Sequence, residues 1–173
     1  PSISSLIINS GDSSTSNTVV NLTVSASDSL SGIAAYYASE SSSAPSASAT
    51  GWVPITTTKS LSSTVNFTLS SHAAAGSYSK TIYLWVKDDA GNVSSSSSDS
   101  ITLIVTDTTA PTNPSIIVNS GATEVFSQPI SITISANDET GVTGYYISDT
   151  TSDRPNSNQS GWTSENSTKN FSK

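Results

Sequence analysis

Apolar and polar residues alternate along several short segments in the first 105 residues of the chain. In the segment VVNLTVSA, Val20, Leu22 and Val24 fall on one face of an extended chain, and the residues between them are polar. A period of two is typical of a β-strand that buries one face and exposes the other. Strands with this pattern are predicted at residues 19–26, 64–70, 81–88 and 101–105.

Two further strands are predicted at residues 4–9 and 33–39, and a weaker one near 51–54. No segment shows the sustained period of an α-helix. Six or seven short strands without helices favour an all-β fold, an antiparallel β-sandwich of the immunoglobulin or fibronectin type III kind. A closed β-barrel is the alternative all-β architecture.

The chain contains an internal repeat. The segment IINSG at 7–11 returns as IVNSG at 117–121, an offset of 110 residues. Further matches pair Asp28 with Asp138, Tyr36 and Tyr37 with Tyr145 and Tyr146, Pro45 with Pro155, and Gly51 and Trp52 with Gly161 and Trp162. A period of this size corresponds to one sandwich domain per repeat. The chain is therefore predicted to hold tandem immunoglobulin-like antiparallel β-sandwiches.

Three segments follow from the repeat: a complete sandwich at 1–106, a proline-containing linker at 107–114, and the N-terminal part of a second sandwich at 115–173. The prolines in the linker fix φ and remove backbone donors, so we expect a short, semi-rigid connection.

The second copy is incomplete within this chain, because it has no counterpart of the strands at 81–88 and 101–105. Half a sandwich leaves its inner face open and its strand edges unpaired. We expect the missing strands to come from further along the same polypeptide. Strand addition by a neighbouring chain is the alternative.

Composition and charge exclude several functional classes. The chain has 13 acidic and 6 basic residues, a net charge of -7, and no basic run, which argues against binding to nucleic acid or to an anionic membrane surface. Cysteine is absent, so neither a disulfide nor a thiolate ligand can form. No apolar run is long enough to suggest a membrane span in this segment.

The segments VKDDAGNVS at 86–94 and DTTAPT at 107–112 resemble bacterial and archaeal Ig-like repeat modules of large secreted and cell-surface proteins. Those modules read INSGA, ATD-x-SGV, a tryptophan-containing stretch, KTVYVxxKDxAGN and DTTAPT. The corresponding residues here are 8–11, 26–33, Trp52, 80–92 and 107–112. The resemblance covers the whole first copy and the front of the second, although the stretch SESSSAPSASATG is longer than usual. It implies a stalk, spacer or sheath outside the cell, and it implies no particular ligand.

The segment DDAGN at 88–92 is predicted to form a turn, with Asp and Asn side chains capping backbone donors and Gly91 supplying a positive φ. A calcium site is the alternative. In an immunoglobulin-type sandwich, the B–C and F–G loops and the start of strand A share one end, which would bring Asp107 near Asp138 and Glu139. The analogous residues in the first copy are Asp28, Asp88 and Asp89. No other cofactor is expected.

Four aromatic residues are candidate contacts for a ligand or partner. Trp52 and Trp162 occupy matched positions in the two copies, where core or cross-strand packing is the usual role of an aromatic ring. Tyr83 and Trp85 alternate with the apolar residues of the strand at 81–88 and are therefore predicted to point away from the core. They could cover an exposed sheet, meet a neighbouring chain or stack on a sugar ring.

Asparagine sequons for N-glycosylation occur at Asn21, Asn66, Asn92, Asn158, Asn166 and Asn170. The chain is so rich in Ser and Thr that chance accounts for most of them. Asn21 lies on the polar face of its predicted strand, where a glycan could be attached. The Ser-rich stretches at 41–49 and 94–98 are either O-glycan carriers or solvated loops.

No catalytic motif is present, and His72 is the only histidine in the chain. The sequence therefore predicts a non-catalytic structural or interaction module of a larger extracellular surface protein or fibre. A carbohydrate-binding or adhesive module that uses exposed aromatic residues is the alternative. The expected partners are further domains of the same polypeptide, neighbouring chains of a surface assembly, and glycans.

Overall fold

The computed structural model describes residues 1–124, 126, 130–148, 153–164 and 170–172. Within these residues the protein is built from β-strands and two short 3-10 turns, with no α-helix. The chain divides into two compact units, Pro1–Thr106 (unit 1) and Asp107–Lys173 (unit 2). The described part contains no helix that is long and apolar enough to cross a membrane.

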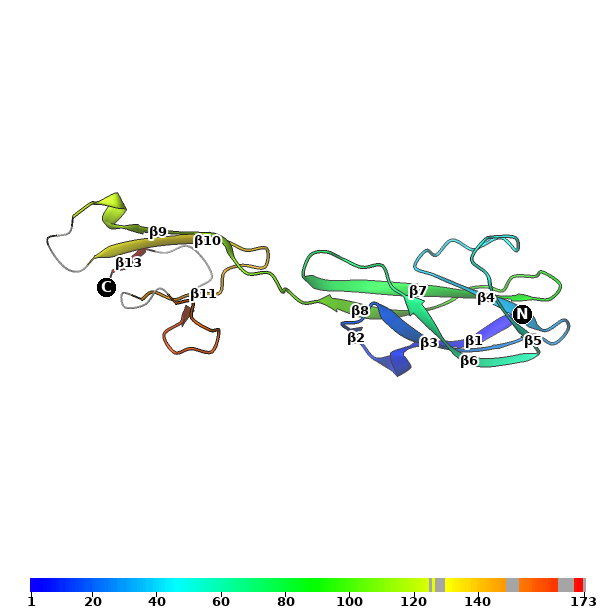
Figure 1. Ribbon diagram of the computed structural model, residues 1–173. Coiled ribbons are helices and arrows are strands. Elements are labelled where there is room, and N and C mark those ends of the chain that lie inside the picture. Colours follow the sequence, from blue (N-terminus) through cyan, green and yellow to red (C-terminus); the bar gives the residue numbers. More distant parts are fainter. Residues whose placement is uncertain (125, 127–129, 149–152, 165–169, 173) are drawn as a thin grey trace. The chain divides into compact units, whose positions relative to one another are not determined.

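Unit 1 contains two sheets (Figure 1). The first sheet is antiparallel, in the order β1-β3-β6, with its middle strand paired along its full length to β6. Its strands are β1 (Ser2–Ile8), β3 (Val19–Ser27) and β6 (Ser60–Thr68). These elements confirm the strands predicted at 4–9, 19–26 and 64–70.

The second sheet of unit 1 has the order β2-β8-β7-β4-β5. Its strands are β2 (Ser14–Thr15), β4 (Ile33–Ser39), β5 (Val53–Thr58), β7 (Gly76–Asp88) and β8 (Ser97–Val105). All neighbours are antiparallel except β2 and β8, which pair in parallel through Ser14 with Thr102 and Thr15 with Leu103.

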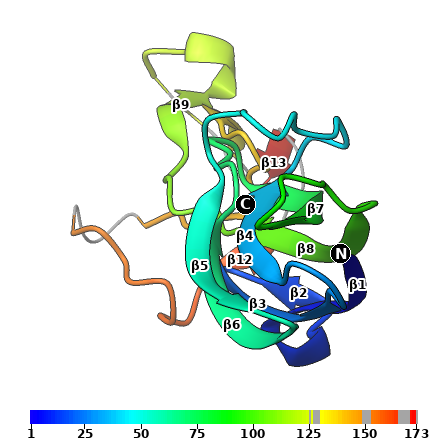
Figure 2. The ribbon, with the colours of Figure 1, turned by 90° about the vertical axis from the view of Figure 1, so that its right-hand side faces the viewer.

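The two sheets bury a common core. Figures 1 and 2 both place β3 and β6 in one layer and β4, β7 and β8 in the other. Along β3, Val20, Leu22 and Val24 are buried and Asn21 is exposed, as the period of two requires. The buried cluster consists of Leu6, Ile8, Val20, Leu22, Val24, Leu69, Ile82, Leu84, Ile101 and Leu103. Two sheets that share a core form a β-sandwich-like architecture rather than one closed barrel.

The repeated NSG motif forms the same tight turn in both units. Asn9, Ser10 and Gly11 all have positive φ values of 44°, 60° and 96°. Such a turn suits Asn and Gly, because the left-handed region is unfavourable for most other residues. The Asn9 side chain accepts a hydrogen bond from the Asn21 amide at 2.8 Å, and Asn119 accepts one from the Ser131 amide at 2.7 Å.

Unit 2 contains a three-stranded sheet in the order β13-β10-β9 and a separate strand pair, β11 with β12. Its strands are β9 (Thr112–Val118), β10 (Ser131–Asn137), β11 (Gly144–Tyr145), β12 (Thr163–Ser164) and β13 (Asn170–Ser172). Because β9 begins at Thr112, the last three residues of the predicted linker lie in a strand. The described residues of unit 2 contain no strand equivalent to β7 or β8.

Candidate functional site

Four aromatic rings gather on the face of the second sheet that points away from the core of unit 1. Trp85 and Tyr83 come from β7, Tyr37 from β4, and Trp52 directly precedes β5. We call these residues the aromatic cluster. Ring centroids are 5.6 Å apart for Tyr37 and Trp52, 6.1 Å for Tyr37 and Trp85, and 6.2 Å for Tyr83 and Trp85. These distances are typical of favourable aromatic pairs.

Trp85 points away from the core of unit 1, as the alternation predicts, but it is not an exposed residue, since it is only 2% exposed. The loop 40–52 is held against the same face of the sheet by hydrogen bonds. Lys87 Nζ donates a hydrogen bond to the Ala47 carbonyl oxygen at 2.8 Å and lies 4.7 Å from the centre of the Trp52 ring. Trp52 Nε1 donates to the Ser46 carbonyl oxygen at 2.9 Å. Trp85 is therefore part of a second, outer core and offers little surface to a sugar or a partner.

Unit 2 repeats the outer part of this arrangement. Trp162 Nε1 donates to the Asn156 carbonyl oxygen at 2.9 Å, and the rings of Trp162 and Tyr146 are 5.8 Å apart. Trp162 remains 42% exposed. The glycine before each tryptophan is required by close packing: a Cβ on Gly161 would lie 2.9 Å from the Tyr146 ring, and Gly51 has the same relation to Tyr37 at 3.0 Å.

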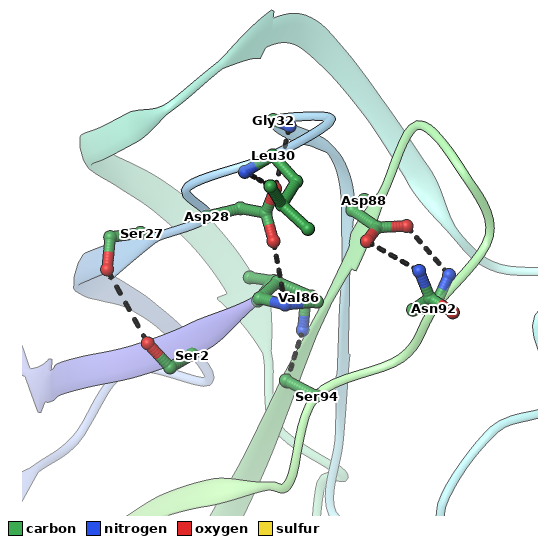
Figure 3. A network of polar contacts seen from close by, with 10 residues as sticks. Ser2, Ser27, Asp28, Leu30, Gly32, Val86, Asp88, Asn92 and Ser94 are labelled. Atoms are coloured by element: carbon green, nitrogen blue, oxygen red, sulfur yellow. Dashed lines mark hydrogen bonds and ion pairs between the residues drawn. The ribbon is translucent and has the colours of Figure 1, made fainter.

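Polar contacts fix the shape of two loops at one end of unit 1 (Figure 3). Asp88 Oδ1 accepts the Asn92 amide at 2.7 Å, and Asp88 Oδ2 accepts Asn92 Nδ2 at 2.8 Å. Gly91 has φ +91°, so the turn predicted from DDAGN is confirmed. Asp28 Oδ1 accepts the amides of Leu30 and Gly32 at 3.1 and 2.8 Å.

These hydrogen bonds change the acidity of the buried carboxylate. The Asn92 side chain holds the pKa of Asp88 below its ordinary value, with help from the Asn92 amide and the Ser31 side chain. Burial and the neighbouring charge of Asp28 raise the pKa of Asp88 and do not reverse this direction. The turn therefore keeps a negative charge in place mainly by donating N–H groups to it.

The residues predicted to bind calcium in unit 2 are arranged around a threonine. Thr140 Oγ1 donates to Asp107 Oδ2, and it also lies 3.0 Å from Asp138 Oδ1. Hydrogen bonds from Thr140 and Thr109 lower the pKa of Asp107. Glu139 is exposed. In this arrangement protein donors already occupy the two facing carboxylates, and a cation would have to displace them.

No group of three or more His, Cys, Asp or Glu side chains suited to a metal ion occurs among the described residues. The analogous carboxylates of unit 1, Asp28 and Asp88, are likewise occupied by amide donors, and Asp89 is exposed. The residues present therefore do not fit a preformed calcium site. Calcium binding stays a prediction from the sequence.

The sequons differ in accessibility. Asn21 and Asn66 are exposed and lie opposite each other on β3 and β6, and Asn158 is exposed in unit 2. Asn92 uses its side-chain amide to bind Asp88. Asn166 lies outside the described residues, as does the side chain of Asn170. Asn21 and Asn66 thus offer two glycan attachment points on one face of the first sheet.

A buried lysine forms an ion pair near the start of β7 in unit 1. Lys80 is buried, and its Nζ donates to Ser70 Oγ and lies 3.4 Å from Glu40 Oε1. Burial raises the pKa of Glu40, but hydrogen bonds from Ser70 and the charge of Lys80 outweigh it and lower the pKa. This ion pair joins the start of the loop 40–52 to β7.

His72 stacks on Tyr78, with ring centroids 3.6 Å apart and planes 4° from parallel. Tyr78 OH in turn donates to the Ala74 carbonyl oxygen at 2.9 Å. These contacts fold the segment before β7 against that strand. They give His72 a packing role.

Unit 2 has a large apolar groove on the inner face of its sheet. The groove has a volume of about 900 Å³. Its apolar lining includes Ile116, Ile134, Val142, Tyr145, Ile147 and Trp162. Ile116 is 59% exposed, whereas its counterpart in unit 1, Leu6, is 8% exposed. The position is apolar in both copies and is covered in only one of them.

In comparisons with protein-family models, curated proteins and solved structures, no match to this chain was found.

Proposed function

We propose that the chain is a pair of immunoglobulin-like repeats that acts as a non-catalytic stalk, spacer or sheath in a larger extracellular surface protein or fibre. The observation that carries the proposal is the repetition of the same structural contacts in both units. The NSG turn and the Gly-Trp hairpin recur with the same hydrogen bonds and ring contacts. The repeated contacts are the ones that maintain the fold, and a spacer is built from repeated copies of one fold.

The strand order of unit 1 supports the immunoglobulin-like assignment. Strands β3 and β6 pair as strands B and E do, and β4, β7 and β8 lie together as C, F and G do. The first strand is divided between the sheets, because β1 pairs with β3 and β2 pairs with β8. Each sheet therefore has a part of the first strand at one edge, and in the second sheet this edge strand is only two residues long, which limits unwanted pairing there.

The surface suits an extracellular setting. Hydroxyl groups on neighbouring strands pair with each other, as Thr81 Oγ1 and Ser100 Oγ do at 2.9 Å. Such pairs make the surface polar without adding charge. The exposed sequons Asn21 and Asn66 would carry glycans if the polypeptide passes through a glycosylating compartment. A net charge of -7 keeps such a surface soluble.

Small-angle X-ray scattering on the full chain and on its Pro111→Gly variant tests the spacer role. A spacer with a semi-rigid linker gives a narrow distribution of distances between the two units, and Pro111→Gly broadens it. A Pro111→Ala variant releases the fixed φ without adding the wider freedom of glycine, so it should broaden the distribution less. A distribution that is already broad in the unmodified chain would contradict the proposal.

The second candidate function is carbohydrate binding, and Trp162 is the residue that favours it. Its ring is 42% exposed and borders the apolar groove of unit 2. Aromatic faces of this kind can stack on sugar rings. Binding to a glycan array that is lost in Trp162→Ala and kept in Trp52→Ala would support this function over the spacer.

A further inference from the structure

The apolar groove of unit 2 corresponds to a position that is filled in unit 1. In unit 1, Leu6 and Val24 belong to the same buried cluster as Ile82 and Leu84 of β7 and residues of β8. The counterparts of Leu6 and Val24 are Ile116 and Ile134, and both line the groove. The groove is therefore the place that β7 and β8 would occupy in a complete sandwich.

The strand order of the two units also indicates that the missing strands belong at this groove. In unit 1, β4 pairs with β5 on one edge and with β7 on the other. In unit 2, β11 pairs with β12 as β4 does with β5, and β13 pairs with β10 as β6 does with β3. Among the described residues, no strand takes the place of β7 beside β11. The three-stranded sheet of unit 2 thus matches the whole first sheet of unit 1, and the pair β11 and β12 is the part that lacks neighbouring strands.

We infer that the groove of unit 2 binds an antiparallel strand pair with the sequence pattern of β7 and β8, carried by the same polypeptide after β13. This inference rests on the repeat relation within the proposed function and is independent of the spacer role. The first strand has branched aliphatic residues at alternate positions, as Ile82, Leu84 and Val86 have in β7. These residues cover Ile116 and Ile134.

Two further features of the bound strands follow from contacts in unit 1. Trp85 packs on Tyr37, so the first bound strand carries an aromatic residue that packs on Tyr146. The Asp89 amide donates to the Gly32 carbonyl oxygen at 3.0 Å, so the turn after that strand reaches Gly141, the counterpart of Gly32. The second feature requires a turn, placed like 88–92, that presents a free backbone amide to this carbonyl oxygen.

The short connection in unit 1 favours strands of the same polypeptide over a separate chain. Only residues 69–75 separate β6 from β7. A strand pair joined behind β13 by a similar connection has a high effective concentration at the groove, on the order of millimolar or more. A separate chain would lose translational and rotational freedom on binding, which weakens association.

The experiment appends residues 68–105 of this chain after Lys173 of the full chain. Amide hydrogen exchange of β9 and β10 is measured by mass spectrometry, together with binding of a dye for exposed apolar surface. We expect exchange in β9 and β10 to slow by about tenfold or more and the dye signal to fall. The matched control carries Ser at the appended copies of Ile82, Leu84 and Val86, and it should leave both signals unchanged.

Four results would overturn the inference. In the first, the appended strands fail to protect β9 and β10 while unit 1 stays protected. In the second, the unmodified chain is a monomer with β9 and β10 already protected and no dye bound. In the third, the groove is closed by a second copy, seen as a dimer by light scattering. Protection by a separate peptide of residues 68–105, but not by the appended strands, would also contradict it. Small-angle X-ray scattering from the Pro111→Gly variant tests the spacer role separately.

Discussion

Trp85 lies edge-on against Tyr37, with ring centroids 6.1 Å apart and planes at 72°, on the face of β7 opposite the core of unit 1. On this outer face, the loop 40–52 contacts the sheet at Lys87 and Trp52 beside the aromatic cluster. Four predictions concern the contacts that hold this arrangement.

Replacing Trp85 by alanine removes a large side chain from the outer core. We expect Trp85→Ala to lower the free energy of unfolding by about 3 to 5 kcal/mol, as for other buried aromatic residues. Urea unfolding followed by circular dichroism measures the change. Trp162→Ala serves as a control at an exposed tryptophan, because that residue is 42% exposed and the loss should be smaller. A cost for Trp85→Ala below about 0.5 kcal/mol would identify the ring as ordinary surface instead.

Gly51→Ala should destabilise unit 1 for two reasons. Gly51 has φ +108°, and its new Cβ would lie 3.0 Å from the Tyr37 ring. Gly91→Ala is the control, because Gly91 has φ +91° but no atom within 4 Å of the added Cβ. The backbone strain common to both costs about 1 to 2 kcal/mol. We expect Gly51→Ala to cost about 1 kcal/mol more, from displacement of the ring. Equal shifts in the urea midpoint would contradict the close packing.

Lys80→Met keeps the length and the apolar stem of the side chain and removes its charge. The change leaves Glu40 without its cation, so we expect a loss of about 1 to 3 kcal/mol in the free energy of unfolding. The double variant Lys80→Met, Glu40→Gln should recover part of this loss, because the uncompensated carboxylate is gone. Strictly additive effects in the double-mutant cycle would show that the two side chains do not interact.

The depressed pKa of Asp88 predicts a loss of stability in acid. Its folded-state pKa lies below the unfolded value of about 3.9, so its contribution is complete above that value. The contribution is lost as the pH falls through the folded pKa. Asp88→Asn should therefore flatten the dependence of the urea midpoint on pH below about pH 4. Some slope should remain, because the pKa values of Asp28, Glu40 and Asp107 are also lowered. An unchanged slope in the variant would contradict the assignment.

The sequence predicts the strands of unit 1 well where apolar and polar residues alternate, as they do along β3. Val20, Leu22 and Val24 can be buried together only in an extended chain. The turn at Gly91 is equally predictable, since its residue types leave few alternatives to a tight turn. The two residues of β2 carry no such period. Their parallel pairing with β8 depends on where the chain passes after the NSG turn, and that is decided by tertiary packing.

The outer core was not predictable from periodicity. Alternation places Trp85 on the face opposite Leu84, but it does not say what lies above that face. The cover comes from a Ser-rich loop whose composition suggests solvent exposure. Two signals in the sequence point to it: the unusual length of the loop and the Gly-Trp pair at its end. Lys87 completes the cover through a backbone carbonyl, a contact that no sequence pattern specifies.

The parallel pairing of β2 with β8 has a mechanical consequence. The chain leaves β8 at the end of unit 1 opposite the N-terminus (Figure 1). A pull on the two ends slides β2 along β8, and the bonds that join Ser14 and Thr15 to β8 are strained together. Bonds that share a load in shear must break at once, whereas bonds that are peeled apart break one after another. Forced opening depends on the barrier to unfolding rather than on equilibrium stability, so we expect this short pairing to add to the resistance of unit 1 to extension.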